Sequence, residues 1–481
     1  MSSKVDQHNM AIMRSAEDEG KAEVVVRGRR NLVRLILFPC PLEGHWNPML
    51  QLATLLHSKY AFSISIIHTK FNSPPNILSN YPDFQFVPID DGSPEEGAAI
   101  EDLMGLIAAL NISCARPFHD RVAQMLADTH HPPVACLISD ALMHFTQPVA
   151  DRLNLPRLIF RTSSITSFLT CAAFPLLRQK GYLPIRDPQS EAMVSELPPL
   201  RIKDLPNIGT DKVDNLYQLV FEMINETKTS VGVISNSFDY LEATSLAKIR
   251  EEFHMPTFFP IGPLHRYSSG IISSGSLLAQ DRSCMTWLHQ QKPESVIYVS
   301  LGSLAVLSED ELVEMAWGLA DSNQSFLWVV RPGSVRGSEE VDQLLPGFRE
   351  ATLGRGRIVG WASQTEVLAH PSVGGFLTHC GWNSTLESVS EGVPMLCWPC
   401  FGDQRVNARF ISHVWKIGLT LENGLNRSNI EKSIRRLVVD SEGKEMRARA
   451  RILKAEAGKS LEKGGSSYEA LQTLVHHILS L

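Results

Sequence analysis

Long hydrophobic runs and an excess of positive charge are both missing from this sequence. No stretch approaches the roughly 18 uninterrupted apolar residues of a membrane-spanning helix. The charged segment over residues 1–30 lacks the apolar core of a secretory signal. A net charge of −7 gives no electrostatic reason to bind nucleic acid or an anionic membrane. We therefore expect a cytoplasmic protein that acts on small molecules, with no nucleic-acid partner and no integral membrane association.

The usual patterns that hold metals are also lacking. The 8 cysteines are spread through the chain, and Cys397-Trp-Pro-Cys400 has no second CxxC to complete a zinc site. We interpret the thiols as reduced and mostly buried. No Asp-x-Asp pair is present to hold a metal on a diphosphate, and Leu453 stands where a phosphate loop ending in Gly458-Lys459-Ser460 would require glycine. These absences favour an enzyme that uses neither a metal nor a bound cofactor.

A strand–helix pattern repeats along the 481 residues, which are enough for two domains. An apolar run over Val33–Phe38 predicts a strand. Asn47-Pro48 predicts the start of a helix, with Asn47 as its N-cap and Pro48 as its first residue. Phe62–His68 predicts the next strand, and a second series begins at Val296–Ser300. Both halves are therefore predicted to be doubly wound α/β domains with a ligand cleft between them.

A Ser/Gly-rich stretch between the two series sets the predicted boundaries. We expect a flexible extension over residues 1–30, a first domain over 31–263, a linker over 264–283, a second domain over 284–465 and a helix over 466–481. The remaining strands are predicted at Phe84–Pro88, Val134–Ser139, Arg157–Arg161, Gly232–Asn236, Thr257–Ile261, Phe326–Arg331, Arg357–Val359, Gly374–Thr378 and Met395–Trp398.

One strand-to-helix transition predicts a phosphate site. The strand over Val373–Thr378 is followed by Gly381, which permits a tight turn and a close approach of a ligand to the backbone. The helix then begins near Asn383 and Ser384, whose free N–H groups would face the cleft. The positive end of a helix binds a diphosphate and can stabilise a departing phosphate group without a metal.

The surrounding segment, Trp361 to Gln404, is highly specific. It reads WASQTEVLAHPSVGGFLTHCGWNSTLESVSEGVPMLCWPCFGDQ and resembles, along its whole length, the signature box of plant secondary-product UDP-glycosyltransferases. Gly44-His45, Ser139-Asp140 and Gly302-Ser303 also fall where that family has them. The subgroup that it resembles most includes steviol-glycoside, cytokinin and benzoxazinoid glucosyltransferases.

This resemblance implies the GT-B fold, an α/β arrangement of two facing Rossmann-like domains. The first domain would bind the acceptor, the second would bind the UDP-sugar, and the C-terminal helix would pack back on the first. We also expect a monomer. The resemblance implies that Trp361 stacks on the uracil, with Ala362 and Gln364 at its edge, and that Glu387 binds the ribose. It implies that the phosphates contact His379 and Ser303, beside Trp382, Asn383 and Ser384. Asp403 and Gln404 would bind the sugar hydroxyls. Gln at the last position of the box is typical of members that prefer glucose, so UDP-glucose is the expected co-substrate.

An acceptor hydroxyl has a high pKa and needs a base during attack. His45 is predicted in a loop after the first strand, and Asp140 follows another strand, so both lie where α/β active sites form. We expect His45 to take the proton and Asp140 to hold the other ring nitrogen. The alternative for Asp140 is a helix cap near His144. Thr162 is expected to contact the sugar or a phosphate, or else to cap a helix.

The acceptor pocket is expected in the first domain. Its candidate residues are Trp46, Met143, His144, Phe145, Phe168 and the region around Leu219, each of which could equally be core. The predicted function is transfer of glucose, with inversion, to a hydroxyl of a small apolar metabolite such as a terpenoid, a phenolic or a hormone. The alternatives are another UDP-sugar donor, a sugar-nucleotide epimerase or a non-catalytic nucleotide-sugar-binding protein. Release of UDP in the presence of acceptors would distinguish a transferase from the last two.

Overall fold

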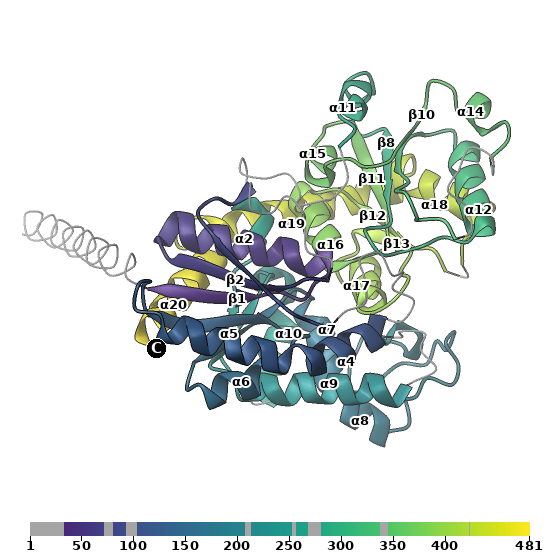
Figure 1. Ribbon diagram of the computed structural model, residues 1–481. Coiled ribbons are helices and arrows are strands. Elements are labelled where there is room, and N and C mark those ends of the chain that lie inside the picture. The colour runs from purple at the N-terminus through teal and green to yellow at the C-terminus, as the bar shows by residue number, and fades with distance from the viewer. Residues whose placement is uncertain are drawn as a thin grey trace, which may run out of the picture.

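The computed structural model describes residues 33–71, 80–92, 103–206, 213–252, 256–267, 280–336, 345–422 and 424–481. The expected extension over residues 1–30 and most of the expected linker over 264–283 lie outside these ranges. Within them the chain forms two α/β lobes, each built on its own sheet (Figure 1). In this part of the chain, no helix combines the length and the apolar character needed to cross a membrane.

The first lobe is built on a parallel sheet with strand order β3-β2-β1-β4-β5-β6-β7 in the described residues. Its strands are β1 (Arg34–Phe38), β2 (Ser63–Thr69), β3 (Gln85–Ile89), β4 (Val134–Asp140), β5 (Arg157–Arg161), β6 (Gly232–Ser235) and β7 (Phe258–Pro260). Strand order reverses at β1 and β4, and ligands bind outside the carboxyl ends of the strands at such a point. Every residue of β1 and of β5 is buried, as expected for strands covered by helices on both faces.

Helices cover both faces of this sheet (Figure 1). They are α2 (Glu43–Tyr60), α4 (Leu103–Ser113), α5 (Ala115–Ala127), α6 (Thr146–Arg152), α7 (Ile165–Ala172), α8 (Phe174–Gln179), α9 (Val213–Lys228) and α10 (Asp239–Glu252), with short 3-10 turns at Ile202–Asp204 and Leu264–Arg266.

The second lobe repeats the design with strand order β10-β9-β8-β11-β12-β13, again all parallel in the described residues. Its strands are β8 (Val296–Ser300), β9 (Ser325–Val329), β10 (Gly356–Val359), β11 (Val373–Thr378), β12 (Met395–Cys397) and β13 (Gly418–Thr420). Its helices are α11 (Ser283–Leu288), α12 (Glu309–Asp321), α14 (Phe348–Ala351), α15 (Gln364–Leu368), α16 (Trp382–Glu391), α17 (Gln404–Arg409), which continues as a π-helical turn over Phe410–Val414, α18 (Arg427–Val438) and α19 (Ser441–Leu461). The sequence analysis missed β13, because Gly418-Leu419-Thr420 contains only one large apolar side chain.

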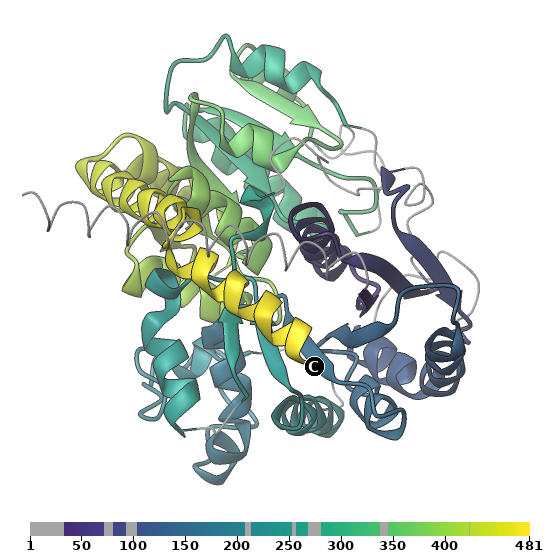
Figure 2. The same ribbon diagram turned by 90° about the vertical axis from the view of Figure 1, so that its left-hand side faces the viewer.

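The chain finally returns to the first lobe. After α19, helix α20 (Ser466–Ser480) lies along the first sheet, as Figure 2 shows. Its apolar face, with Leu471, Leu474 and Ile478, is buried in the same core cluster as Leu35 and Leu37 of β1. The last helix therefore ties the two lobes together.

Helix α2 does not begin where the sequence predicted. It starts at Glu43, with Leu42 as N-cap, so Pro48 lies inside the helix and His45 sits in the first helical turn rather than in a loop. Pro48 has no N–H for the carbonyl of Gly44, four residues earlier, which would normally be left without a partner. Asn383 Nδ2 of the second lobe donates to this carbonyl at 2.8 Å. A contact between the lobes thus satisfies the group that the proline leaves free.

Candidate active site between the two lobes

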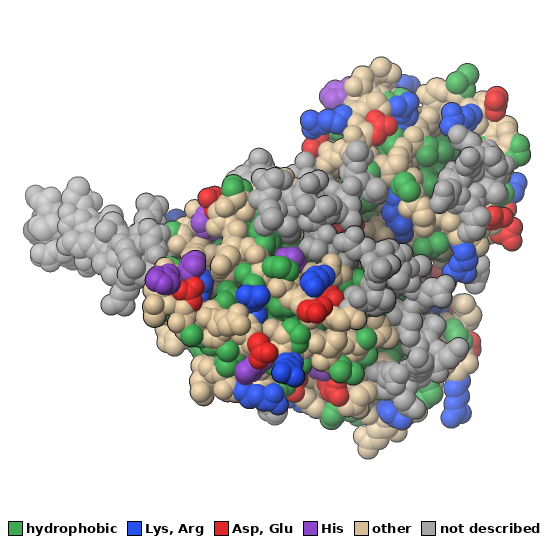
Figure 3. Space-filling model, viewed as in Figure 1, with side chains coloured by type: hydrophobic (Ala, Val, Ile, Leu, Met, Phe, Trp, Pro, Cys, Tyr) green, Lys and Arg blue, Asp and Glu red, His purple; other side chains and the backbone are tan. Residues whose placement is uncertain are grey.

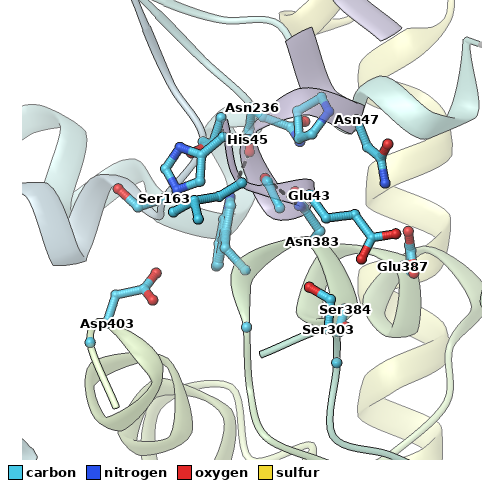
Figure 4. Close-up of a pocket in the computed structure, with 18 of the residues that line it drawn as sticks. Glu43, His45, Asn47, Ser163, Asn236, Ser303, Asn383, Ser384, Glu387 and Asp403 are labelled. Atoms are coloured by element: carbon cyan, nitrogen blue, oxygen red, sulfur yellow. Dashed lines mark hydrogen bonds between the residues drawn. The ribbon is translucent and has the colours of Figure 1, made fainter. Parts of the chain in front are cut away.

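A cavity of about 1270 Å³ lies between the lobes and is lined by both. Figure 4 shows His45 and Ser163 of the first lobe on one side and Ser384 and Asp403 of the second lobe on the other. A single drug-sized ligand usually occupies about 300–1,000 Å³. The volume is therefore enough for a nucleotide-sugar together with a second molecule.

On the side of the first lobe, the structure brings His45, Asp140 and Thr162 together. His45 Nδ1 lies 2.7 Å from Asp140 Oδ2 and 3.0 Å from Thr162 Oγ1. The Asp140 side chain is 1% exposed, and its other oxygen accepts the N–H of Leu142 at 2.9 Å. With Nδ1 facing a carboxylate, the proton of the neutral ring sits on Nδ1. The Nε2 atom, which has no hydrogen-bond partner among the described residues, keeps its lone pair.

The carboxylate controls the protonation of this histidine. Burial by itself would lower the pKa of His45, but the charge and the hydrogen bond of Asp140, with a further contribution from Asp403, outweigh it and raise the pKa. A raised pKa makes the imidazole a better proton acceptor at Nε2. Asp140 also stabilises the imidazolium that would result.

The capping alternatives for Asp140 and Thr162 are wrong. Helix α6 follows Phe145 and has no side-chain cap, and Asp140 instead binds His45 and Leu142. The N-cap of α7 is Ser164, whose side chain accepts the N–H of Ser167. Thr162 therefore does not cap α7, and its hydroxyl contacts the His45 ring.

On the side of the second lobe, α16 points its N-terminus into the cavity, with Asn383 and Ser384 in its first turn. His379 lies beside them, between two glycines. A Cβ at Gly302 or Gly381 would come within 2.6 or 2.5 Å of the imidazole, so only glycine leaves room for the ring. Burial, and to a lesser degree the charge of Arg331, lowers the pKa of His379 to about 4, so this ring is neutral at pH 7.

A second polar group in the cavity centres on Glu387. Gln364 Nε2 donates to Glu387 Oε2 at 2.7 Å and to Ser384 Oγ at 2.8 Å, which fixes the carboxylate at the cavity wall. Burial raises the pKa of Glu387 to about 7, even though the Gln364 hydrogen bond opposes the shift. Trp361 and Ala362 line the same end of the cavity, and the Trp361 Nε1 atom is buried without a partner.

Asp403 and Gln404 lie at the start of α17, on the opposite side of the α16 terminus. Gln404 Oε1 accepts the N–H groups of Cys400 and Phe401 at 2.8 and 3.0 Å, so its amide nitrogen is left for a ligand. Asp403 accepts a hydrogen bond from Asn407, and burial raises its pKa. Ser303, at the end of β8, also lines the cavity.

One residue expected at the donor site has another partner. The Trp382 indole is buried, and its Nε1 donates to the carbonyl of Asn236 in the first lobe at 2.7 Å. Its side chain thus joins the lobes. Trp382 and the other expected donor residues all line the cavity.

Most of the candidate acceptor-pocket residues lie in the core, which was the alternative given for each of them. Leu219 lines the cavity, but Trp46, Met143, Phe145 and Phe168 are packed in the core of the first lobe. His144 pairs with Glu222 at 3.3 Å and does not line the cavity. Aromatic side chains after a strand fit a core as well as a pocket, so their type alone could not decide.

The predicted region around Leu219 does reach the cavity, through Leu216, Val220 and Met223 as well. The first lobe adds lining residues that the sequence analysis did not select, namely Leu103, Met104, Ile107, Phe174 and Arg161. The apolar members belong to helices α4, α8 and α9, and the sequence does not show which of their apolar side chains face the cavity and which face the core. Arg161 did carry a signal, because it is a charged residue at the carboxyl end of a strand whose three central residues are apolar.

The sequence matches the family described as "UDP-glucoronosyl and UDP-glucosyl transferase" over residues 95–456. It is 47% identical to UDP-glycosyltransferase 76B1 of Arabidopsis thaliana, over 93% of this chain and 98% of that protein. It is also 47% identical to UDP-glycosyltransferase 76G1 of Stevia rebaudiana, over 96% and 100%.

Solved structures are similar along nearly the whole chain as well. An anthocyanidin 3-O-glucosyltransferase in complex with UDP matches with a TM-score of 0.82 and 27% identity, over 94% of this chain and all of that one. A Phytolacca americana enzyme, complexed with UDP-2fluoro-glucose and pterostilbene, matches with a TM-score of 0.79 and 28% identity, over 93% and 99%. The fold is therefore GT-B, and with the cavity lined by both lobes these likenesses show that the chain belongs to the UDP-glycosyltransferase family and is an enzyme of that class.

Proposed function

We propose that the protein transfers glucose from UDP-glucose to a hydroxyl of a small, largely apolar acceptor and inverts the anomeric centre, giving a β-glucoside. One observation carries the proposal. A histidine whose Nδ1 is held by a buried carboxylate leaves Nε2 free, in a cavity that also contains the start of α16 and the signature-box side chains. This is the arrangement that a base-assisted displacement of UDP requires.

On the acceptor side, the hydroxyl would donate to His45 Nε2 and lose its proton as its oxygen attacks the anomeric carbon. Asp140 would keep the ring in the correct tautomer and stabilise the positive charge. Because the base belongs to the first lobe and the UDP site to the second, attack would come from the face opposite the leaving group. Inversion follows from that direction of attack.

On the donor side, the N–H groups at the start of α16, with the neutral His379 and Ser303, would stabilise the charge that develops on the departing diphosphate. No metal or bound cofactor takes part in this proposal. Trp361 would stack on the uracil with Ala362 and Gln364 at its edge, and Glu387 would accept the ribose hydroxyls. Asp403 and the free amide nitrogen of Gln404 would bind the glucose hydroxyls. Similarity to an anthocyanidin 3-O-glucosyltransferase supports glucose as the sugar and a phenolic hydroxyl as one acceptor type.

The test is a mass-spectrometric screen with UDP-glucose, EDTA and a library of terpenoids, phenolics and hormones. We expect a product heavier by one hexose, with the β configuration by proton NMR and with no loss of rate in EDTA. The His45→Ala variant should bind UDP normally and form almost no product. Near-normal turnover by that variant would refute the assignment of the base, and dependence on a metal would refute the role given to α16.

A further inference from the structure

The first-lobe side of the cavity contains a buried guanidinium group that has no carboxylate partner among the described residues. Arg161, the last residue of β5, lines the cavity and is 7% exposed. Its Nη2 donates to Ser163 Oγ at 2.8 Å, its Nη1 approaches the Met223 sulfur at 3.4 Å, and its Nε is buried without a partner. In the part of the chain that the structure describes, Arg161 forms no ion pair.

A buried guanidinium is unfavourable unless an opposite charge or hydrogen-bond acceptors offset its loss of hydration. Burying an unpaired charge costs far more free energy than burying a charge that has an opposite partner. A thioether is only a weak acceptor. The ring of Phe168, 4.2 Å from the guanidinium carbon, adds a cation–π contact but supplies no hydrogen-bond acceptor. The nearby carboxylates are occupied, since Asp140 binds His45 and Asp403 binds Asn407. The guanidinium thus retains donor capacity at the wall of the cavity.

The position of this group is informative. Its neighbours Phe168 and Met223 belong to α7 and α9, and α9 provides the apolar acceptor wall through Leu219 and Val220. The next residue in the chain is Thr162, which contacts the His45 ring. An apolar wall, a cation and the base therefore lie within one lobe, on the side of the cavity away from the uracil end.

We propose that Arg161 binds a carboxylate of the acceptor, so that the preferred acceptors are small hydroxy acids with an apolar body. The inference rests on the proposed function and narrows its acceptor class. A guanidinium pairs with a carboxylate through two parallel hydrogen bonds, which would orient the acceptor as well as hold it. The hydroxyl oxygen then bonds to the anomeric carbon, the bond from that carbon to UDP breaks, and the hydroxyl proton passes to His45 Nε2. The carboxylate is unchanged, so the product is a glycoside with a free carboxyl group and not a glucose ester.

The experiment compares the three hydroxybenzoates and mandelate with their methyl esters as acceptors. For the acid whose hydroxyl best reaches the base, the wild type should show kcat/KM about 30-fold or more above the ester, and its product should resist mild alkali. Arg161→Met should remove that advantage, so that kcat/KM falls far more for the acid than for its ester. Arg161→Lys keeps the charge but loses the paired geometry and should retain part of the preference. Arg178→Met is the matched control, because Arg178 is an exposed arginine stacked on Tyr217 outside the cavity, and it should leave both rates unchanged.

Two kinetic results would overturn the inference. One is a wild type that prefers every ester to its acid. The other is an Arg161→Met variant that loses acid and ester activity equally, which would place Arg161 in the donor site with Asp403. If no acceptor in the set is glucosylated, calorimetric titration of the same acids and esters in the presence of UDP separates the two proposals. Binding of an acid that is lost in Arg161→Met would support the inference even then, and equal binding of acid and ester would refute it.

Discussion

Replacing Asp140 by asparagine tests the proposed base directly. Asparagine can still accept the Leu142 N–H through its oxygen, so the loop after β4 should keep its shape. Its amide nitrogen would then face His45 Nδ1 in place of the carboxylate oxygen now 2.7 Å away. Because an amide N–H donates, the neutral ring would carry its proton on Nε2, the atom that must accept the acceptor's proton.

The expected loss follows from these two changes. A positioned general base contributes about 10²–10⁴-fold, and a ring in the wrong tautomer loses most of that, so kcat should fall by about 10²–10⁴-fold. The KM for UDP-glucose should stay nearly constant, because His45 and Leu142, the hydrogen-bond partners of Asp140, both belong to the first lobe. The pH profile should change as well. Asp140 raises the pKa of His45 above its ordinary 6.5, and the neutral ring is the active form, so wild-type activity should fall as the pH drops through that raised value. Residual activity of Asp140→Asn should persist to lower pH.

The assay is the initial rate of UDP release across pH 5 to 9 at saturating UDP-glucose. Asp128→Asn is a suitable control, because Asp128 forms an exposed pair with His131 at 2.6 Å outside the cavity and should have no kinetic effect. Retention of kcat within about threefold of the wild type would refute the reasoning, since a base contributes far more. A loss confined to the KM for UDP-glucose would place Asp140 in the donor site instead.

Other predictions concern the donor side and the contact between the lobes. Burial raises the pKa of Glu387 to about 7, and the proposed contact with the ribose hydroxyls requires the ionised carboxylate, so the KM for UDP-glucose should rise as the pH falls below about 7. Glu387→Gln should abolish that dependence in the same titration. Trp361→Ala should raise the KM for UDP-glucose by about 5–150-fold through lost stacking, with most of it recovered in Trp361→Phe. Asn383→Ala removes an exposed hydrogen bond to the Gly44 carbonyl and should lower the free energy of unfolding by about 0.5–1.5 kcal/mol, as measured by denaturant titration; an unchanged midpoint would show that water replaces the contact.

The sequence was most informative where function depends on contiguous residues. The signature box supplies the end of β11, the N-terminus of α16 and the polar start of α17 within one segment, so its residues reach the cavity together. The pairing of His45 with Asp140 spans 95 positions, but His45 follows β1 and Asp140 ends β4, and these parallel strands are neighbours in the sheet. Parallel topology puts such strand ends at one edge, which is why this pair could be anticipated.

The sequence was least informative where one group depends on a distant partner. Helix α2 starts at Glu43 and so leaves the Gly44 carbonyl without its usual partner inside the helix. The donor that this carbonyl finds, Asn383, is 339 positions away, and no local pattern predicts that contact. The acceptor wall raises the same difficulty. Whether a face of α4 or α9 meets the cavity depends on how each helix packs, and buried apolar residues look alike in either case.

The contacts between the lobes involve the same segments as the chemistry. Asn383 of α16 binds the helix that carries His45, and Trp382 binds the chain after β6. Asn407, whose side chain also donates to Asp403, accepts a hydrogen bond from Ser164, the cap of α7, and donates to the carbonyl of Cys380. Asn383 and Asn407 thus connect the proposed donor side with the helices that carry the base and the wall of the first lobe. Figure 3 shows charges of both signs scattered over one face of the molecule, and ion pairs such as Arg201–Glu422 and Arg409–Asp204 also join the lobes. An exchange of either lobe between related enzymes would therefore have to keep these polar contacts and ion pairs.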